Sequence, residues 1–263
     1  MLGAIIGDII GSLYEFESDK TKDFPLFTQD NRPTDDSMMT IAVGLTCAMA
    51  SLDDEREFKQ VLKNNMRKIG RAYPDAGYGG MFYNWLMYDH AYPYESIGNG
   101  SAMRASPCGW AMDTLEDTER LAAWSAEVTH DSPEGIRGAQ SVAAAIFLAR
   151  NGATKAEIRE YIEEKYYELD FTVDGIRGGY TFDVTCEGSV PQAIVCFLDG
   201  EDYEDTVRNA VSLGGDGDTI SAIAGSIAEA FYGIPDTIRD EGLSYLDEDL
   251  MNYYLEYADE MYR

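Results

Sequence analysis

Apolar residues along the chain recur mostly at helical spacing, and runs that alternate between apolar and polar residues are nearly absent. The apolar segment 1–17 meets an acid at Asp8 and is interpreted as a core helix. Segment 171–188 carries scattered Gly, Thr and Val, and we expect an ordered loop or a short hairpin that is long enough to shape a pocket. The pattern therefore predicts an all-α fold. Further helices are expected over residues 38–51, 55–70, 101–112, 133–151, 154–168, 189–199, 202–213, 219–233 and 243–262.

The chain has 263 residues, and neither a Pro/Ser-rich linker nor a repeat of fixed period divides it. Its hydrophobic share of 45% and charged share of 26% are close to those of globular proteins, which argues against disorder and coiled coils. We therefore expect one compact domain over residues 1–263.

Acidic residues dominate the charge, because 48 Asp and Glu face 20 Lys and Arg for a net charge of −28. Such a surface repels phosphate backbones and anionic lipids, so binding to nucleic acid or to a membrane is not expected. The N-terminus has no basic segment typical of a signal peptide, and no apolar stretch is long enough to span a bilayer. The four cysteines form no C-x-x-C pair, which indicates reduced thiols. We expect a cytoplasmic, monomeric protein.

Two acidic clusters each stand directly before an apolar helix: residues 34–37 read Thr-Asp-Asp-Ser, and residues 214–219 read Gly-Gly-Asp-Gly-Asp-Thr. Ordinary N-capping is one interpretation, because an acid at a helix start accepts hydrogen bonds from free N–H groups. Four clustered carboxylates, however, repel one another unless they are protonated or bind metal. Oxygen ligands without His or Cys favour Mg²⁺, Mn²⁺ or Ca²⁺, and Ile220 excludes an EF-hand. The second interpretation is a binuclear metal centre between two helix N-termini.

Three further features carry candidate chemistry. Glu15 follows the first apolar helix between aromatic residues, and it is either an acid at the edge of the core or a candidate base. Segment 98–101, Gly-Asn-Gly-Ser, is either a plain turn or an anion site built from backbone N–H groups. His130 precedes the helix that starts near Pro133, where it either caps, orients a neighbour or takes part in chemistry.

Five segments in a fixed order carry a resemblance to a known family. They are Gly7-Asp8 to Glu15-Phe16, Thr34 to Ser37, Gly98 to Arg104, Thr129-His130, and Gly214 to Thr219 with Ala224-Gly225. The ordered set resembles the ADP-ribosylglycohydrolase family, which includes dinitrogenase-reductase-activating glycohydrolases and ADP-ribosyl-arginine and ADP-ribosyl-serine hydrolases. Ser37 and Gly217 stand where the family usually has Thr, and neither departure removes a carboxylate.

The resemblance implies a compact, orthogonal multi-helix bundle that binds two Mg²⁺ or Mn²⁺ ions. It implies hydrolysis of the glycosidic bond between ADP-ribose and an acceptor, either a protein side chain or a small molecule, with release of ADP-ribose. Glu15 and Asp36 are the implied catalytic residues. The implied metal ligands are Thr34, Asp35, Asp36, Asp216, Asp218 and Thr219. The implied substrate-binding residues are Glu15, Tyr78, Gly79, Gly98, Asn99, Gly100, Ser101 and His130. Of the aromatic residues, either Tyr78 or Phe82 would line the adenosine side, and core packing is the alternative for both.

Three other functions are weighed against this one. A catalytically silent ADP-ribose-binding protein is possible in principle, although Glu15 and all four clustered Asp are retained. A metal phosphohydrolase of the HD type would use His130-Asp131 and His90, but it leaves both acidic clusters unexplained. An isoprenoid-synthase site of the Asp-Asp-x-x-Asp type requires an acid where Met39 stands.

Overall fold

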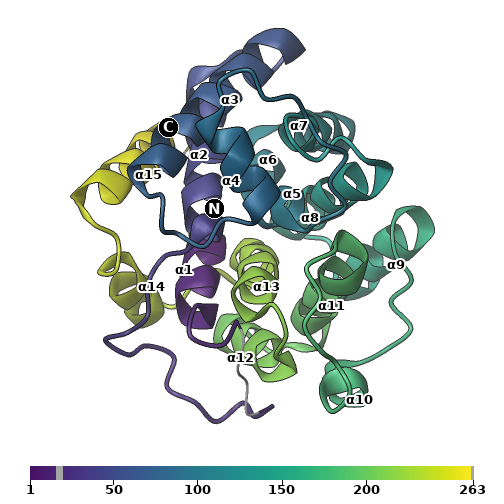
Figure 1. Cartoon of the computed structure of the whole chain (residues 1–263). Coiled ribbons are helices and arrows are strands. Elements are labelled where there is room, and N and C mark those ends of the chain that lie inside the picture. Colours follow the sequence, from purple (N-terminus) through teal and green to yellow (C-terminus); the bar gives the residue numbers. More distant parts are fainter. Residues whose placement is uncertain (16–19, 262–263) are drawn as a thin grey trace.

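The computed structural model describes residues 1–15 and 20–261, and Phe16 lies outside these ranges. Regular structure within them is helical, apart from an isolated bridge between Gly98 and Thr185, so the predicted all-α fold is confirmed (Figure 1). The helices of the described ranges are α1 (Leu2–Gly11), α2 (Asp35–Met49), α3 (Glu55–Ala72), α4 (Gly80–Met87), α5 (Gly100–Met103), α6 (Ser106–Ala111), α7 (Leu115–Glu127), α8 (Pro133–Arg150), α9 (Lys155–Lys165), α10 (Val173–Arg177), α11 (Cys186–Asp199), α12 (Tyr203–Leu213), α13 (Gly217–Tyr232), α14 (Asp236–Leu243) and α15 (Glu248–Met261).

Several boundaries differ from those predicted from the sequence. Segment 171–188 forms the short helix α10 and a loop that leads into α11, and it does not form a hairpin. The expected helix over 101–112 is divided into α5 and α6, because Pro107 lies in the first turn of α6 and has no N–H to continue a longer helix. Helices α4, α7 and α14 were not expected, and α15 begins only at Glu248.

Helices α1 and α13 form the centre of the molecule and lie side by side, although they are far apart in sequence (Figure 1). All ten residues of α1 are buried, as its apolar sequence requires. The two backbones touch at Gly7, where a Cβ atom would lie only 2.1 Å from the carbonyl oxygen of Ser221. Only glycine permits this approach, so α1 and α13 pack more closely than helices separated by side chains.

The same packing brings the two acidic segments together. One turn beyond Gly7, a Cβ atom at Gly11 would lie 2.6 Å from Cα of Asp218, in the first turn of α13. Helix α2 also contacts α1, and its N-terminal segment is held by Asp8 of α1. Helix α1 thus carries both acidic helix starts on its two sides. No helix in the described part of the chain is long and apolar enough to cross a membrane.

Candidate metal centre

Ordinary capping does not account for the acids at the two helix starts. The side chain that caps α2 is Thr34, whose hydroxyl accepts from the backbone N–H of Asp36 at 3.3 Å. Asp216 occupies the N-cap position of α13 but makes no side-chain cap hydrogen bond. Capping therefore leaves most carboxylate oxygens of both clusters available for another role, although Asp218 Oδ1 accepts from the backbone N–H of Thr219 at 2.9 Å.

The carboxylates converge in two overlapping groups. Oxygen atoms of Asp8, Asp36 and Asp218 lie within 4.8 Å of one another, and so do oxygen atoms of Glu15, Asp216 and Asp218. The four aspartates are buried and Glu15 is half-buried. Asp218 belongs to both groups, which makes it the centre of the cluster. Among the described residues, neither group contains a histidine, so the two groups do not support a metal site of the HD type.

Asp8 is the member of the cluster that sequence reasoning did not select as a site residue. Its carboxylate accepts hydrogen bonds from Thr34 N at 2.8 Å, Thr34 Oγ1 at 2.6 Å and Ser37 N at 3.1 Å, and from the Ser37 hydroxyl. These bonds use the oxygens of Asp8 to fix the first turn of α2. Since the Thr34 hydroxyl donates to Asp8, its oxygen lone pairs face away from that carboxylate. The sequence did contain a signal for Asp8, namely an acid within an otherwise apolar helix, because a buried charge needs partners.

Burial and mutual repulsion raise the pKa values of the clustered acids. Burial is the largest cause in each case, and the charge of Asp218 is the next for Asp8, Glu15, Asp35, Asp36 and Asp216. The pKa of Glu15 rises to about 7, opposed only by the nearby Arg32. The cluster therefore disfavours its own negative charge, and a bound cation would relieve that repulsion.

The donor set fits a hard cation. Asp36 Oδ1 is buried and has no hydrogen-bond partner, while its Oδ2 accepts from the Thr219 hydroxyl at 3.3 Å. Asp216 Oδ2 accepts from the amide of Asn99 at 2.6 Å. A buried carboxylate oxygen without a partner is costly unless something else binds it. The oxygen-only cluster is thus a possible site for a divalent metal such as Mg²⁺ or Mn²⁺.

The cluster opens into a cavity of about 530 Å³, which we call the acidic cavity. Its lining includes Glu15, Asp35, Asp36, Gly77, Gly79, Phe82, Tyr94, Gly98, Asn99, Gly100, Arg104, His130, Asp216, Asp218 and Thr219. Asp35 lies outside the two carboxylate groups, beside Gly77, where a Cβ atom would come within 3.2 Å of Asp35 Oδ1. Most of the residues that the sequence suggested therefore share one cavity.

Three of the suggested residues do not line this cavity. Thr34 is buried next to the cavity, and its hydroxyl donates a hydrogen bond to Asp8. Ser101 is buried and donates to the carbonyl oxygen of Gly135 at 2.7 Å. Tyr78 packs on Phe82, with ring centroids 5.7 Å apart, and of these two rings Phe82 is the one that lines the cavity.

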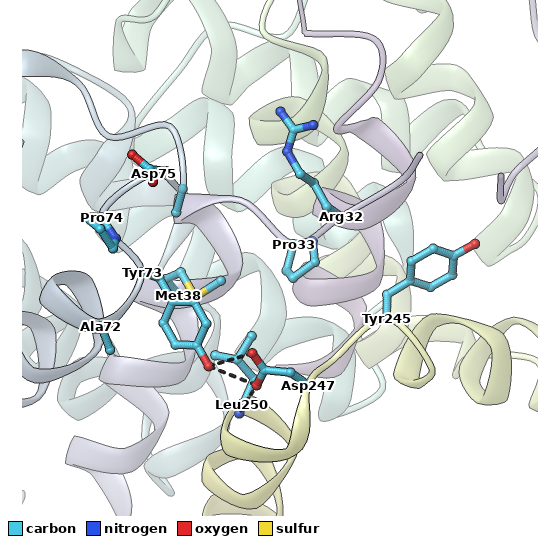
Figure 2. A pocket seen from close by; sticks show the side chains of 11 residues that line it. Arg32, Pro33, Met38, Ala72, Tyr73, Pro74, Asp75, Tyr245, Asp247 and Leu250 are labelled. Atoms are coloured by element: carbon cyan, nitrogen blue, oxygen red, sulfur yellow. Dashed lines mark hydrogen bonds between the residues drawn. The ribbon is translucent and has the colours of Figure 1, made fainter. Parts of the chain in front are cut away.

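A second cavity, of about 430 Å³, lies next to the acidic cavity, and segment 72–80 contributes to both. Residues 72–76 line the second cavity, and Gly77, Gly79 and Gly80 line the acidic cavity. Figure 2 shows Arg32 on one side of the second cavity, and the hydroxyl of Tyr73 directed at Asp247 on the other. That hydroxyl lies 2.9 and 2.8 Å from the two carboxylate oxygens. The same segment is joined to the candidate site, because the carbonyl oxygen of Ala76 accepts from the backbone N–H of Asp35 at 2.9 Å. The Tyr73–Asp247 contact therefore connects this part of the site to the C-terminal part of the chain.

The sequence is similar to known proteins over most of its length. The family model for ADP-ribosylglycohydrolase matches residues 1–263. ADP-ribosylhydrolase ARH3 of Homo sapiens is 26% identical over 95% of this chain and 90% of its own length. ADP-ribosylarginine hydrolase Tri1 of Pseudomonas putida (strain GB-1) is 25% identical over 89% of this chain and 70% of its own.

The fold matches as well. A chain of a solved structure described as an ADP-ribosylglycohydrolase-related protein complex superposes with a TM-score of 0.71, covering 99% of this chain and 97% of that one at 23% identity. That likeness supports the helical architecture, and the match of the family model rests on the sequence itself. The chain therefore belongs to the ADP-ribosylglycohydrolase family.

Proposed function

We propose that the protein hydrolyses the glycosidic bond between ADP-ribose and an acceptor, and that it does so with two bound divalent cations, Mg²⁺ or Mn²⁺. The observation that carries this proposal is the convergence of Glu15, Asp36, Asp216 and Asp218 at one cavity of a family member. A cavity of about 530 Å³ is within the size range of small-ligand sites.

The metal ligands in this proposal come from the starts of α2 and α13. Metal ions bound there would supply Lewis acidity and a more acidic water, and would orient the hydroxyl groups of the ribose. The unpartnered Asp36 Oδ1 and the shared position of Asp218 support this assignment. The proposed ligands are Thr34, Asp35, Asp36, Asp216, Asp218 and Thr219.

Glu15 and Asp36 are the proposed catalytic residues. Glu15 is half-buried at the cavity, where its carboxylate can accept a proton from the attacking water or stabilise the cationic character of the sugar in the transition state. Asp36 contributes a buried carboxylate oxygen with no protein partner, and in its ionised form, which bound cations would favour, it stabilises the same positive charge.

The remaining residues would hold the ADP-ribose moiety. In segment 98–101, the N–H of Gly98 donates to Ser96 Oγ at 3.1 Å and that of Asn99 to the carbonyl oxygen of Val184 at 2.8 Å, so the N–H groups of Gly100 and Ser101 are the ones left for the diphosphate. His130 would donate to a ligand oxygen, and Gly79 leaves open space, since a Cβ atom there would meet no described atom beyond its chain neighbours within 4 Å. Tyr78 would contribute indirectly, because it packs on Phe82 and so holds the ring that lines the cavity.

The biological setting belongs to the same proposal. We propose a cytoplasmic, monomeric enzyme of one domain that acts on ADP-ribosylated protein or on a small ADP-ribose conjugate. Free, buried thiols at Cys47, Cys108, Cys186 and Cys196 support a reducing compartment.

Release of free ADP-ribose tests the activity. The protein is incubated with ADP-ribosyl-arginine and ADP-ribosyl-serine peptides, with Mg²⁺ and with a chelator. We expect release from at least one peptide that requires the metal. Binding of ADP-ribose without release from any conjugate would instead favour a catalytically silent binding protein.

Glu15→Gln separates binding from turnover. The amide keeps the shape of the side chain but cannot accept a proton, so the rate should fall about 10²- to 10⁴-fold at saturating metal while ADP-ribose still binds. Glu168→Gln, at an exposed position away from the cavity, is the matched control and should leave the rate unchanged. A Glu15→Gln variant as fast as this control would remove Glu15 from the mechanism.

A further inference from the structure

Three buried side chains form a hydrogen-bonded chain that ends at the acidic cavity. Arg104 Nη2 donates to Thr129 Oγ1 at 2.8 Å, and to the carbonyl oxygen of Ser125 at 3.1 Å. Thr129 Oγ1 lies 2.7 Å from Nδ1 of His130. Arg104 and His130 both line the cavity, while Thr129 is fully buried behind them.

The chemistry of the groups fixes the direction of these bonds. A guanidinium only donates, so the Thr129 oxygen accepts from Arg104. The hydroxyl hydrogen of Thr129, which is fully buried, needs an acceptor. Of the two described side chains that are hydrogen-bonded to Thr129 Oγ1, Arg104 and His130, only His130 can accept, so the hydroxyl donates to Nδ1 of His130.

His130 is neutral in this environment. Burial and the nearby charge of Arg104 hold the pKa of His130 well below its usual range. A neutral imidazole carries one proton, and Nδ1 accepts the Thr129 hydrogen, so the proton resides on Nε2.

Nε2 of His130 faces the glycine segment that lines the cavity. A Cβ atom would lie 3.1 Å from Nε2 at Gly100 and 3.7 Å from it at Gly98. A side chain at Gly100 would therefore crowd the ring nitrogen, and glycine leaves room beside it. The Nε2–H group is adjacent to the backbone on which the ligand diphosphate is proposed to rest.

We propose that Thr129 is a positioning residue: with its oxygen held by Arg104, it fixes His130 as the Nε2–H tautomer, a neutral donor for an oxygen atom of the ligand. The donor role rests on the function proposed above, whereas the tautomer is a property of the protein alone. With a fixed tautomer, every protein molecule presents a proton to the ligand at Nε2. No binding free energy is then lost in converting molecules whose Nε2 carries a lone pair.

The tautomer is measurable because the chain has two histidines, His90 and His130. The full-length protein is labelled with nitrogen-15 histidine, and the imidazole nitrogen resonances are recorded at pH 7. The exposed His90 is assigned with a His90→Asn variant. We expect His130 to show an unprotonated Nδ1 and a protonated Nε2. An Nδ1–H tautomer or an imidazolium would overturn the proposal without any variant.

Two substitutions test the role of the hydroxyl. Thr129→Val keeps the shape but removes the hydrogen bond, so we expect a mixture of tautomers and a Kd for ADP-ribose about 2- to 13-fold higher by calorimetry. Thr129→Ser restores the hydroxyl and should restore both values. A Thr129→Val protein that keeps the pure Nε2–H tautomer would refute the positioning role.

The same measurements separate this inference from the proposed function. If the wild-type protein shows the expected tautomer but does not bind ADP-ribose, the choice of ligand is wrong and the tautomer assignment holds. If it binds ADP-ribose with His130 in the other tautomer, the positioning role is wrong and the ligand stands. Should Thr129→Val fail to fold, the wild-type spectrum and that of Thr129→Ser decide, and loss of the Nε2–H tautomer in Thr129→Ser counts against the proposal.

Discussion

Replacement of Gly7 by alanine tests the central contact of the fold. The added methyl group would lie 2.1 Å from the carbonyl oxygen and 2.6 Å from the carbonyl carbon of Ser221. Both atoms belong to the backbone of α13, so no side-chain rotation relieves the clash. The two helices would have to separate by about 1.3 Å, the difference between 2.1 Å and the 3.4 Å at which ordinary contacts begin.

The free energy of unfolding should fall by about 2 kcal/mol in this variant. Overpacking of this kind costs up to about 3 kcal/mol, and the better helix propensity of alanine returns about 1 kcal/mol. At about 2.1 cal/mol/K per residue, the unfolding entropy of a 263-residue protein is about 0.55 kcal/mol/K. A loss of about 2 kcal/mol therefore lowers Tm by about 4 °C.

Thermal unfolding followed by circular dichroism, in the presence of a chelator, measures this change. The matched control is Gly178→Ala, since Gly178 is exposed, has φ −68°, and has no described atom beyond its chain neighbours within 4 Å of the added methyl group. The control should melt at or slightly above the wild-type temperature, because alanine reduces the entropy of the unfolded chain. If Gly7→Ala melts as the control does, α1 and α13 are not in backbone contact.

Three further predictions concern the metal centre. In Gly11→Ala the new methyl group, 2.6 Å from Cα of Asp218, should displace that residue by more than the roughly 0.2 Å a metal site tolerates; calorimetry should show weaker Mg²⁺ or Mn²⁺ binding, and an unchanged Kd would contradict the assignment of Asp218. In the intact protein, metal at 100 times its Kd should stabilise the fold by about 2.7 kcal/mol, so melting curves with and without a chelator that coincide would argue against a bound cation. The raised pKa values of Asp8 and Glu15 (about 7) and of Asp216 (about 8) mean that the folded state holds protons which the unfolded chain has already lost. Stability without metal should therefore decrease as pH rises from about 4 to about 8, and a Tm in chelator that rises over this range would show that these acids are not buried together.

The sequence was most informative where apolar spacing and helix-start residues agreed. The expected helices over 202–213 and 219–233 correspond to α12 and α13, and the one that starts near Pro133 corresponds to α8. Helix α7 was not expected, although Thr114 caps it and it buries residues such as Leu121. Short helices such as α4 and α14 depend on tertiary packing, which local propensity does not report.

The candidate site was predictable in its acids but not in their supports. Two Asp-rich helix starts suggested a shared centre, and the structure brings Asp36 and Asp218 together. The contribution of Asp8 depends on α1 lying between α2 and α13, a long-range relation that spacing along the chain does not contain. Likewise, the sequence left open whether Tyr78 or Phe82 lies near the ligand or packs in the core, and the choice depends on tertiary packing: Phe82 lines the cavity, and Tyr78 packs on it.

The pairing of α1 with α13 also sets the order in which the protein can assemble during synthesis. Helix α1 is made first, and its partner follows more than 200 residues later. At about 5–20 residues per second, the ribosome needs about 10–40 s to cover that distance. Throughout this interval the apolar surface of α1 lacks its final neighbour, and Asp8 lacks Asp218. The N-terminal helix therefore reaches its final packing late in synthesis, and the acidic cluster is completed only when α13 has emerged.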